Sequence, residues 1–148
     1  MMDRDALLQM MGKIWNAYGL RLEQSFREAG LPMNAEQYRF LKVVQERPGQ
    51  YQEIYARLLG RDRSSTTRMI QSLHRRGWVQ RSLDKEQSGP EPRDTRVKRI
   101  RLTEEGDAIL AKAVQPAMSA LFPAWENFPG EEREVLEQLL KRIYINIQ

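Results

Sequence analysis

The sequence contains no cysteine and only one histidine, and these two scarcities exclude several kinds of chemistry. Without thiols the chain forms no disulfides, binds no iron–sulfur cluster and uses no thiol as a nucleophile or oxidation sensor. His74 alone is too little for a His-rich zinc site, whereas carboxylate-based metal binding stays open. The spacings of nucleophile–base sets and phosphate-binding loops are also missing. We therefore expect no catalytic residues, metal or cofactor, and we do not expect an enzyme.

Long apolar runs are lacking as well, since no segment approaches the roughly 20 apolar residues of a membrane span. The first residues include Asp3 and Asp5 where a secretion signal would be basic, and no apolar block follows them. We expect a cytoplasmic protein that makes no membrane contact. A length of 148 residues with 41% hydrophobic content predicts one folded unit with its own core.

Positive charge is concentrated in less than a third of the chain. Residues 61–101 hold twelve Arg or Lys and five Asp or Glu, a balance of +7, whereas the remainder has a balance of −3. A local excess of this kind is typical of a phosphate-binding surface. A solvated basic face without a partner is the alternative that charge alone leaves open.

Helical periodicity predicts six helices, and alternating residues predict two strands between the fourth and fifth of them. In the short third helix we expect Ile54, Leu58 and Leu59 to face inward, and in the fifth we expect Pro116 to kink or split the helix. The third and fourth helices, joined by a turn at Gly60, form a helix-turn-helix, which the strand pair makes winged. The expected helices cover residues 4–29, the stretch between Asn34 and Pro48, 52–59, 63–76, 104–121 and 131–146, and the expected strands cover 78–82 and the stretch from Val97 to Leu102.

The fourth helix has two chemically different sides. At about 100° per residue, Thr66, Ile70 and Leu73 fall on one side, which we expect to be packed. Arg binds guanine and Gln binds adenine through paired hydrogen bonds, and short hydroxyls bond base edges or phosphates. An ordinary wet helix face is the alternative, but the basic hairpin that follows favours DNA. The opposite, polar side carries Ser64, Arg68, Gln71 and Arg75.

Several ordered motifs together resemble the MarR (multiple antibiotic resistance regulator) family. They are the run Leu59–Arg68, the run Arg75–Val79, Asp94-Thr95-Arg96, and Leu102-Thr103-Glu104-Glu105-Gly106 after it. The similarity covers nearly the whole chain. It implies a mainly α fold with a small β-hairpin wing, in which 1–148 form a single unit. A winged helix-turn-helix lobe would span about 33–102, and a helical dimerisation region about 4–30 and 103–148.

The resemblance also implies a function and a set of contact residues. A homodimer would bind a pseudo-palindromic operator as a sequence-specific double-stranded-DNA-binding transcriptional regulator, a ligand-responsive repressor. A winged-helix module that docks proteins without reading DNA is the alternative. The expected wing contacts are Asp94, Arg96 and Lys98, with Asp94 orienting Arg96 in the minor groove. The expected recognition-helix contacts are Arg63, Ser64, Ser65, Thr67, Arg68, Gln71 and Arg75.

Three aromatic residues mark an expected effector site. Family members often bind a small aromatic or phenolic molecule between the dimer helices and the DNA-binding lobe, where Trp15, Tyr18 and Tyr38 could line a cleft. Core packing is the alternative for each of them. The chain departs from the family pattern in a longer wing loop at 84–93 and in Thr66, which stands at a usually apolar position. We expect the Thr66 hydroxyl to bond the carbonyl four residues earlier.

Overall fold

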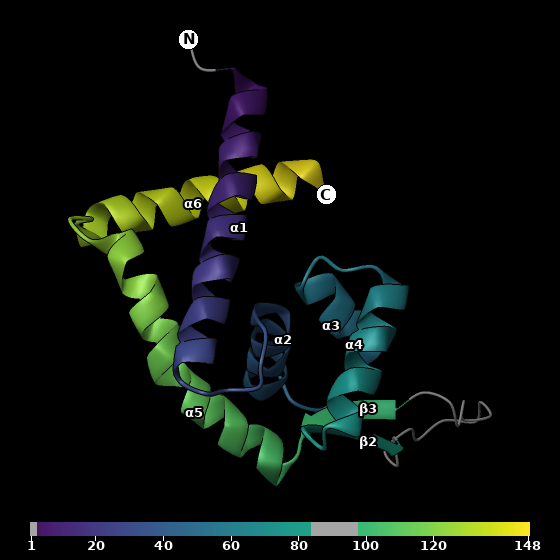
Figure 1. The fold of residues 1–148 in the computed structure, drawn as a ribbon. Helices are drawn as coiled ribbons and strands as arrows, with labels where there is room; N and C mark the ends of the chain where they lie inside the picture. The colour runs from purple at the N-terminus through teal and green to yellow at the C-terminus, as the bar shows by residue number, and fades with distance from the viewer. Residues whose placement is uncertain (1–2, 84–97) are drawn as a thin grey trace.

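A computed structural model describes residues 3–83 and 98–148, which form a mainly helical fold with one small sheet (Figure 1). The six predicted helices are present, and α5 runs through Pro116 without splitting. Val97, the predicted start of the second strand, lies outside the described residues. The elements are α1 (Arg4–Glu28), α2 (Ala35–Glu46), β1 (Gln50–Tyr51), α3 (Gln52–Leu58), α4 (Arg63–Arg75), β2 (Val79–Leu83), β3 (Lys98–Leu102), α5 (Glu104–Leu121), the 3₁₀ helix η1 (Phe122–Trp125) and α6 (Gly130–Ile147).

Side-chain caps set where four of the helices begin, namely α1, α2, α4 and α5. Asn34 accepts a hydrogen bond from the amide of Gln37 at 2.8 Å, and the Gln37 side chain accepts one from the Asn34 amide at 3.0 Å. This reciprocal capping box starts α2. Thr103 caps α5 through a single hydrogen bond, which its hydroxyl oxygen accepts from the Gly106 amide at 3.0 Å.

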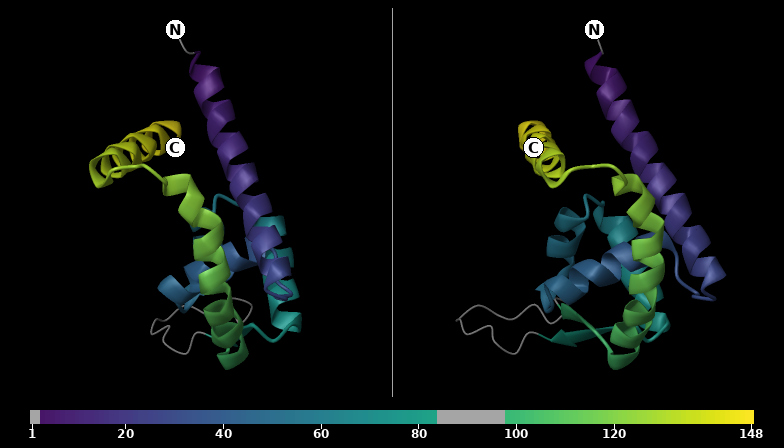
Figure 2. Two further views of the ribbon diagram at one scale, coloured as in Figure 1. Left: turned by 60° about the vertical axis from the view of Figure 1, so that its left-hand side comes forward. Right: turned by 90° about the vertical axis from the view of Figure 1, so that its left-hand side faces the viewer.

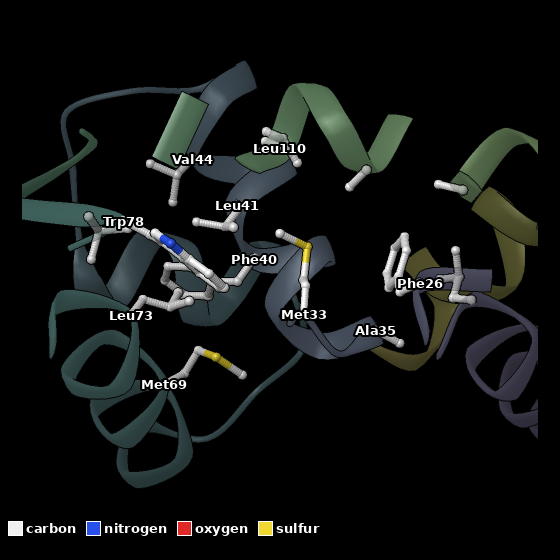
Figure 3. Close-up of a cluster of buried hydrophobic side chains, with 14 of the residues drawn as sticks. Phe26, Met33, Ala35, Phe40, Leu41, Val44, Met69, Leu73, Trp78 and Leu110 are labelled. Carbon is white, nitrogen blue, oxygen red and sulfur yellow. The ribbon is translucent and has the colours of Figure 1, made fainter. Parts of the chain in front are cut away.

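The core lies where α2, α4, α5 and the sheet meet (Figure 3). Trp78, Phe40 and Leu73 lie together, and Met33 lies between them and Phe26. Trp78 is only 7% exposed and anchors the core. Burying these large side chains supplies most of the driving force that holds α4 against the rest of the molecule.

The sheet has a third strand that the sequence does not predict. The strand order is β1-β3-β2, all antiparallel, with Gln50 opposite Ile100. Tyr55 of α3 is fully buried, and its hydroxyl donates to the Arg47 carbonyl at 2.7 Å and accepts from the Gln50 amide at 3.1 Å. The expected inward face of α3 is therefore wrong at Leu58, which is exposed, because the helix turns Tyr55 and Ala56 toward the core instead.

At one end of the molecule, much of the surface of the long helices α1 and α6 does not pack against the rest of the described chain. α1 packs along α5, but only Leu22 and Phe26 of α1 are buried, both in its second half. α6 stands apart from α1 in both views of Figure 2, and none of its side chains is buried. No helix among the described residues is both long and apolar enough to cross a bilayer. The exposed large apolar side chains of α1 and α6 include Leu7, Leu8, Met10, Ile14, Val135, Leu139, Leu140, Tyr144, Ile145 and Ile147.

Candidate nucleic-acid interface

The helix-turn-helix is formed by α3, a short turn and α4. Gly60 in the turn has φ +60°, a left-handed conformation that glycine adopts without strain. Asp62 then caps α4 by accepting from the Ser65 amide at 2.8 Å. At the other end Gly77 has φ +75°, and the amide of Trp78 bonds the Leu73 carbonyl at 3.0 Å, which closes the last turn. Both ends of α4 are therefore fixed by local hydrogen bonds.

Hydrogen bonds also set the electrostatics of the α4 cap. The Ser65 amide, followed by the Ser65 side chain, holds the pKa of Asp62 below its usual range, because both favour the ionised carboxylate. A carboxylate at the start of the helix is further favoured by the partial positive charge there. The cap thus keeps its charge throughout the neutral pH range.

The two sides of α4 divide as the pattern predicts. Thr66, Ile70 and Leu73 are fully buried, and Thr66 donates its hydroxyl to the Asp62 carbonyl at 2.8 Å, so this buried polar group is satisfied. Arg63, at the start of the helix, is exposed. We call the exposed side opposite the core the reading surface of α4; it consists of Ser64, Arg68, Gln71 and Arg75.

Two of the predicted contact residues use their hydroxyls inside the protein. Thr67 is half-buried and donates to the Arg63 carbonyl at 2.9 Å, and its oxygen also accepts from the side chain of Gln52 in α3. Ser65, also half-buried, lies at 3.5 Å from the Asp62 carbonyl through its hydroxyl. Both side chains flank the reading surface, and the single proton of Thr67 is committed to the backbone.

Of the predicted wing contacts, only Lys98 falls in the described part of the chain, where it is exposed at the start of β3. Asp94, Arg96 and the loop at 84–93 lie outside the described residues. Next to Lys98 along β3, Arg99 donates to the Gly49 carbonyl at 3.0 Å and stacks over the Tyr51 ring at 5.2 Å. These contacts hold the base of the wing against β1. They could not be predicted from the sequence, because β1 itself was not predicted.

The expected effector residues lie near a cation that the sequence did not single out. The Arg39 guanidinium of α2 lies 3.7 Å from the centre of the Trp15 ring and 5.4 Å from that of Tyr18. Trp15 is more than half exposed, whereas Tyr38 packs against the Phe26 ring at 5.3 Å. The structure thus joins Trp15 and Tyr18 around Arg39 and places Tyr38 against the core.

Arg39 is held in an unusual environment. Within the described part of the chain its buried Nε and Nη2 atoms make no hydrogen bond. Burial lowers the pKa of Arg39, while Tyr18 and the carboxylates of Glu36 and Glu23 act in the opposite direction. Burying guanidinium nitrogens without a hydrogen-bond acceptor is costly. Two hollows of about 300 Å³ each lie elsewhere, one beside Arg21 and Ser119 and one beside Arg27 and Arg76.

The capped helix-turn-helix, its exposed polar helix and the adjoining antiparallel sheet define a winged helix-turn-helix protein. The MarR family model matches residues 33–87, a stretch that includes α2, β1, α3, α4 and β2. Residues 33–87 thus form a MarR-family domain, and the chain is a DNA-binding transcriptional regulator.

One relative and one solved structure match along most of their length, and a further relative matches over less than half of its own. The HTH-type transcriptional regulator YybA of Bacillus subtilis strain 168 is 26% identical over 142 residues, which are 96% of this chain and 89% of YybA. The transcriptional repressor MprA of Escherichia coli K12 is 28% identical over 85 residues, 57% of this chain and 44% of MprA. The crystal structure of the transcriptional regulator SlyA superposes with a TM-score of 0.80 at 27% identity, covering 95% of this chain and 93% of SlyA.

Proposed function

We propose that this regulator is a ligand-responsive repressor that binds a pseudo-palindromic operator in double-stranded DNA as a homodimer. One observation carries the proposal: α4 buries Thr66, Ile70 and Leu73 while Arg68 and Gln71 on its other side stay exposed. A helix held this way presents base-reading groups to the major groove.

Affinity and specificity come from different side chains. Arg63, Arg75 and Lys98 are exposed and suit phosphate oxygens, so binding is expected to fall steeply with salt. Arg68 and Gln71 lie at the centre of the reading surface and suit base edges, with a guanine and an adenine as their best partners. Phosphate contacts position the helix, and the base contacts select the sequence.

The homodimer is supported by exposed apolar side chains of α1 and α6, and α6 and the start of α1 lie at the end of the molecule opposite the sheet (Figure 1). An amphipathic helix such as α6, with no buried side chain, is only marginally stable in water by itself. Leu139 and Leu140 of α6 and Leu7 and Ile14 of α1 remain exposed, which is more apolar surface than a monomer normally leaves in water. A second copy of the same surface covers it and places two α4 helices against one operator.

Repression follows from occupancy of the operator. A dimer lying over two half-sites covers DNA that a promoter-binding enzyme needs, so affinity for the operator sets the level of transcription. The likeness to the repressor MprA supports this direction of control.

The first experiment is selection of bound sites from a random duplex pool at about 0.15 M salt. The proposal predicts an enriched inverted repeat whose half-sites are centred about one helical turn apart, or a multiple of it. A pool without enrichment, or a purified protein that stays monomeric, contradicts it. A protein-docking module would give the unenriched pool.

The effector proposal rests on Arg39 and its aromatic neighbours. A small aromatic anion would pair its charge with the unsatisfied Arg39 nitrogens and its ring with Trp15 and Tyr18. Because these residues come from α1 and α2, such a ligand joins the dimer-side helix to the DNA-binding lobe and shifts the separation of the two α4 helices.

Calorimetric titration with benzoate, and with neutral benzamide as the matched probe, tests this site. We expect benzoate to bind and to weaken operator binding, benzamide to bind more weakly, and Arg39→Met to lose the difference between them. Equal binding of both probes to the unaltered protein contradicts the anionic class. DNA binding without ligand is expected to persist in Arg39→Met, which separates this site from the reading surface.

A further inference from the structure

Gln52, the first residue of α3, lies outside the set of residues that the sequence assigns to DNA. Its side-chain Nε2 donates a hydrogen bond to Oγ1 of Thr67, in the second turn of α4. This bond joins the two helices of the helix-turn-helix at the edge of the reading surface. Thr67 lies only about 40° around the helix from Gln71.

The direction of this bond follows from proton counting. A threonine hydroxyl has one proton, and that of Thr67 is donated to the Arg63 carbonyl at 2.9 Å. Toward Gln52 the same oxygen is therefore an acceptor, which fixes the amide with Nε2 rather than Oε1 facing Thr67. An amide nitrogen carries two protons, and within the described residues the second N–H of Gln52 has no partner.

The position of Gln52 indicates which group of the DNA can accept a hydrogen bond from this second proton. In a helix-turn-helix the second helix enters the major groove while the first crosses the DNA backbone. A donor on α3 that touches the flank of α4 thus stands beside the sugar–phosphate strand at the wall of the groove. Half-buried Gln52 has its amide oriented by Thr67 before DNA arrives, so little conformational freedom is lost on binding.

We propose that Gln52 donates one Nε2 proton to Thr67 and the other to a phosphate oxygen of the operator, and thereby sets how deeply α4 enters the groove. This inference rests on the DNA-reading function proposed above. It also reassigns Thr67, whose hydroxyl acts through Gln52 and not by donating to a base.

Binding to the selected operator and to a random duplex is measured for the unaltered protein and for Gln52→Met, which keeps the length of the side chain but not its donors. We expect a loss of about fivefold on both duplexes, because a neutral phosphate bond carries no sequence information. The salt dependence stays unchanged, since no charge is removed. Gln45→Met, at an exposed position of α2, is the matched control and is expected to bind normally.

A second measurement separates a phosphate contact from a purely structural role. Single phosphates of one half-site are replaced by neutral methylphosphonates, and affinities are compared between the unaltered protein and Gln52→Met. At one phosphate we expect the replacement to weaken DNA binding by the unaltered protein and to have little further effect on DNA binding by Gln52→Met. Thr67→Val combined with Gln52→Met is expected to lose less than the sum of the two single losses.

Three results would each overturn the inference. They are methylphosphonate profiles of the same shape for the unaltered protein and Gln52→Met, normal binding by Gln52→Met, and a changed base preference of Gln52→Met at one position. If the unaltered protein itself enriches no duplex, the proposed function fails instead, and the two failures are distinguishable.

Discussion

Gly106 of α5 lies so close to Trp78 that a Cβ atom on it would stand 2.0 Å from the Trp78 carbonyl oxygen. The same carbonyl accepts a hydrogen bond from the Thr103 amide at 3.0 Å. The start of α5 is therefore fixed directly onto the end of α4. Because α5 also packs along α1, this junction links the dimer-side helices to the segment that follows α4.

Gly106→Ala tests this junction. The added methyl forces the backbone of α5 away from Trp78, and we expect a loss of about 1–3 kcal/mol in the free energy of unfolding. Urea titration measures that loss, and operator affinity at a concentration where the variant is folded is expected to fall as well. Gly130→Ala at the start of α6 is the control, since the nearest atom to a Cβ on Gly130 would be Nη2 of Arg133, 4.0 Å away. Equal stability of both variants would contradict the close contact.

Asp62→Ala tests the cap of α4. We expect the melting temperature at neutral pH to fall by a few degrees, because the Ser65 amide loses its acceptor. Asp62→Asn keeps an acceptor, so its melting temperature is expected to fall less.

Acid titration of the unaltered protein and of Asp62→Ala shows the same contact. The pKa of Asp62 is lowered in the folded protein, so its stabilisation is present above the unfolded carboxyl pKa of about 3.9 and is lost as the pH falls through the lower folded value. The difference in stability between the two proteins is expected to shrink over that acidic window. A difference that stays constant down to the lowest pH would show that the carboxylate charge plays no part.

Leu140→Glu tests the surface of α6. A charge in a covered apolar patch is expected to dissociate the dimer at micromolar concentration and to lower operator affinity by at least about tenfold. Analytical ultracentrifugation measures the mass. Gln138→Glu, which adds the same charge beside it at a polar position, serves as the control. A Leu140→Glu protein that remains dimeric would place the dimer contact elsewhere.

Local chemistry explains why much of the fold was predictable. Asn34, Asp62 and Thr103 cap their helices through side chains three residues from the amides that they bind, so the signal lies within one turn of sequence. The two sides of α4 follow from helical periodicity, and the burial of Thr66 beside Ile70 confirms that periodicity. A pattern this short does not depend on how distant segments pack.

The features that were missed depend on distant segments. β1 has only two residues and exists because Gln50 and Tyr51 pair with β3, about 50 residues away. Buried Tyr55 has backbone partners for its hydroxyl in that same sheet, at Gln50 of β1 and Ile100 of β3. Arg39 meets Trp15 only after α1 and α2 have packed, so no periodicity within either helix indicates it.

The most direct test of the central claim is a repeat of the site selection with Arg68→Ala. If the exposed side of α4 reads bases, the enriched inverted repeat keeps its spacing and loses its preference at one position in each half-site. An unchanged sequence preference, or a loss of affinity that is the same for all duplexes, would contradict base reading by Arg68.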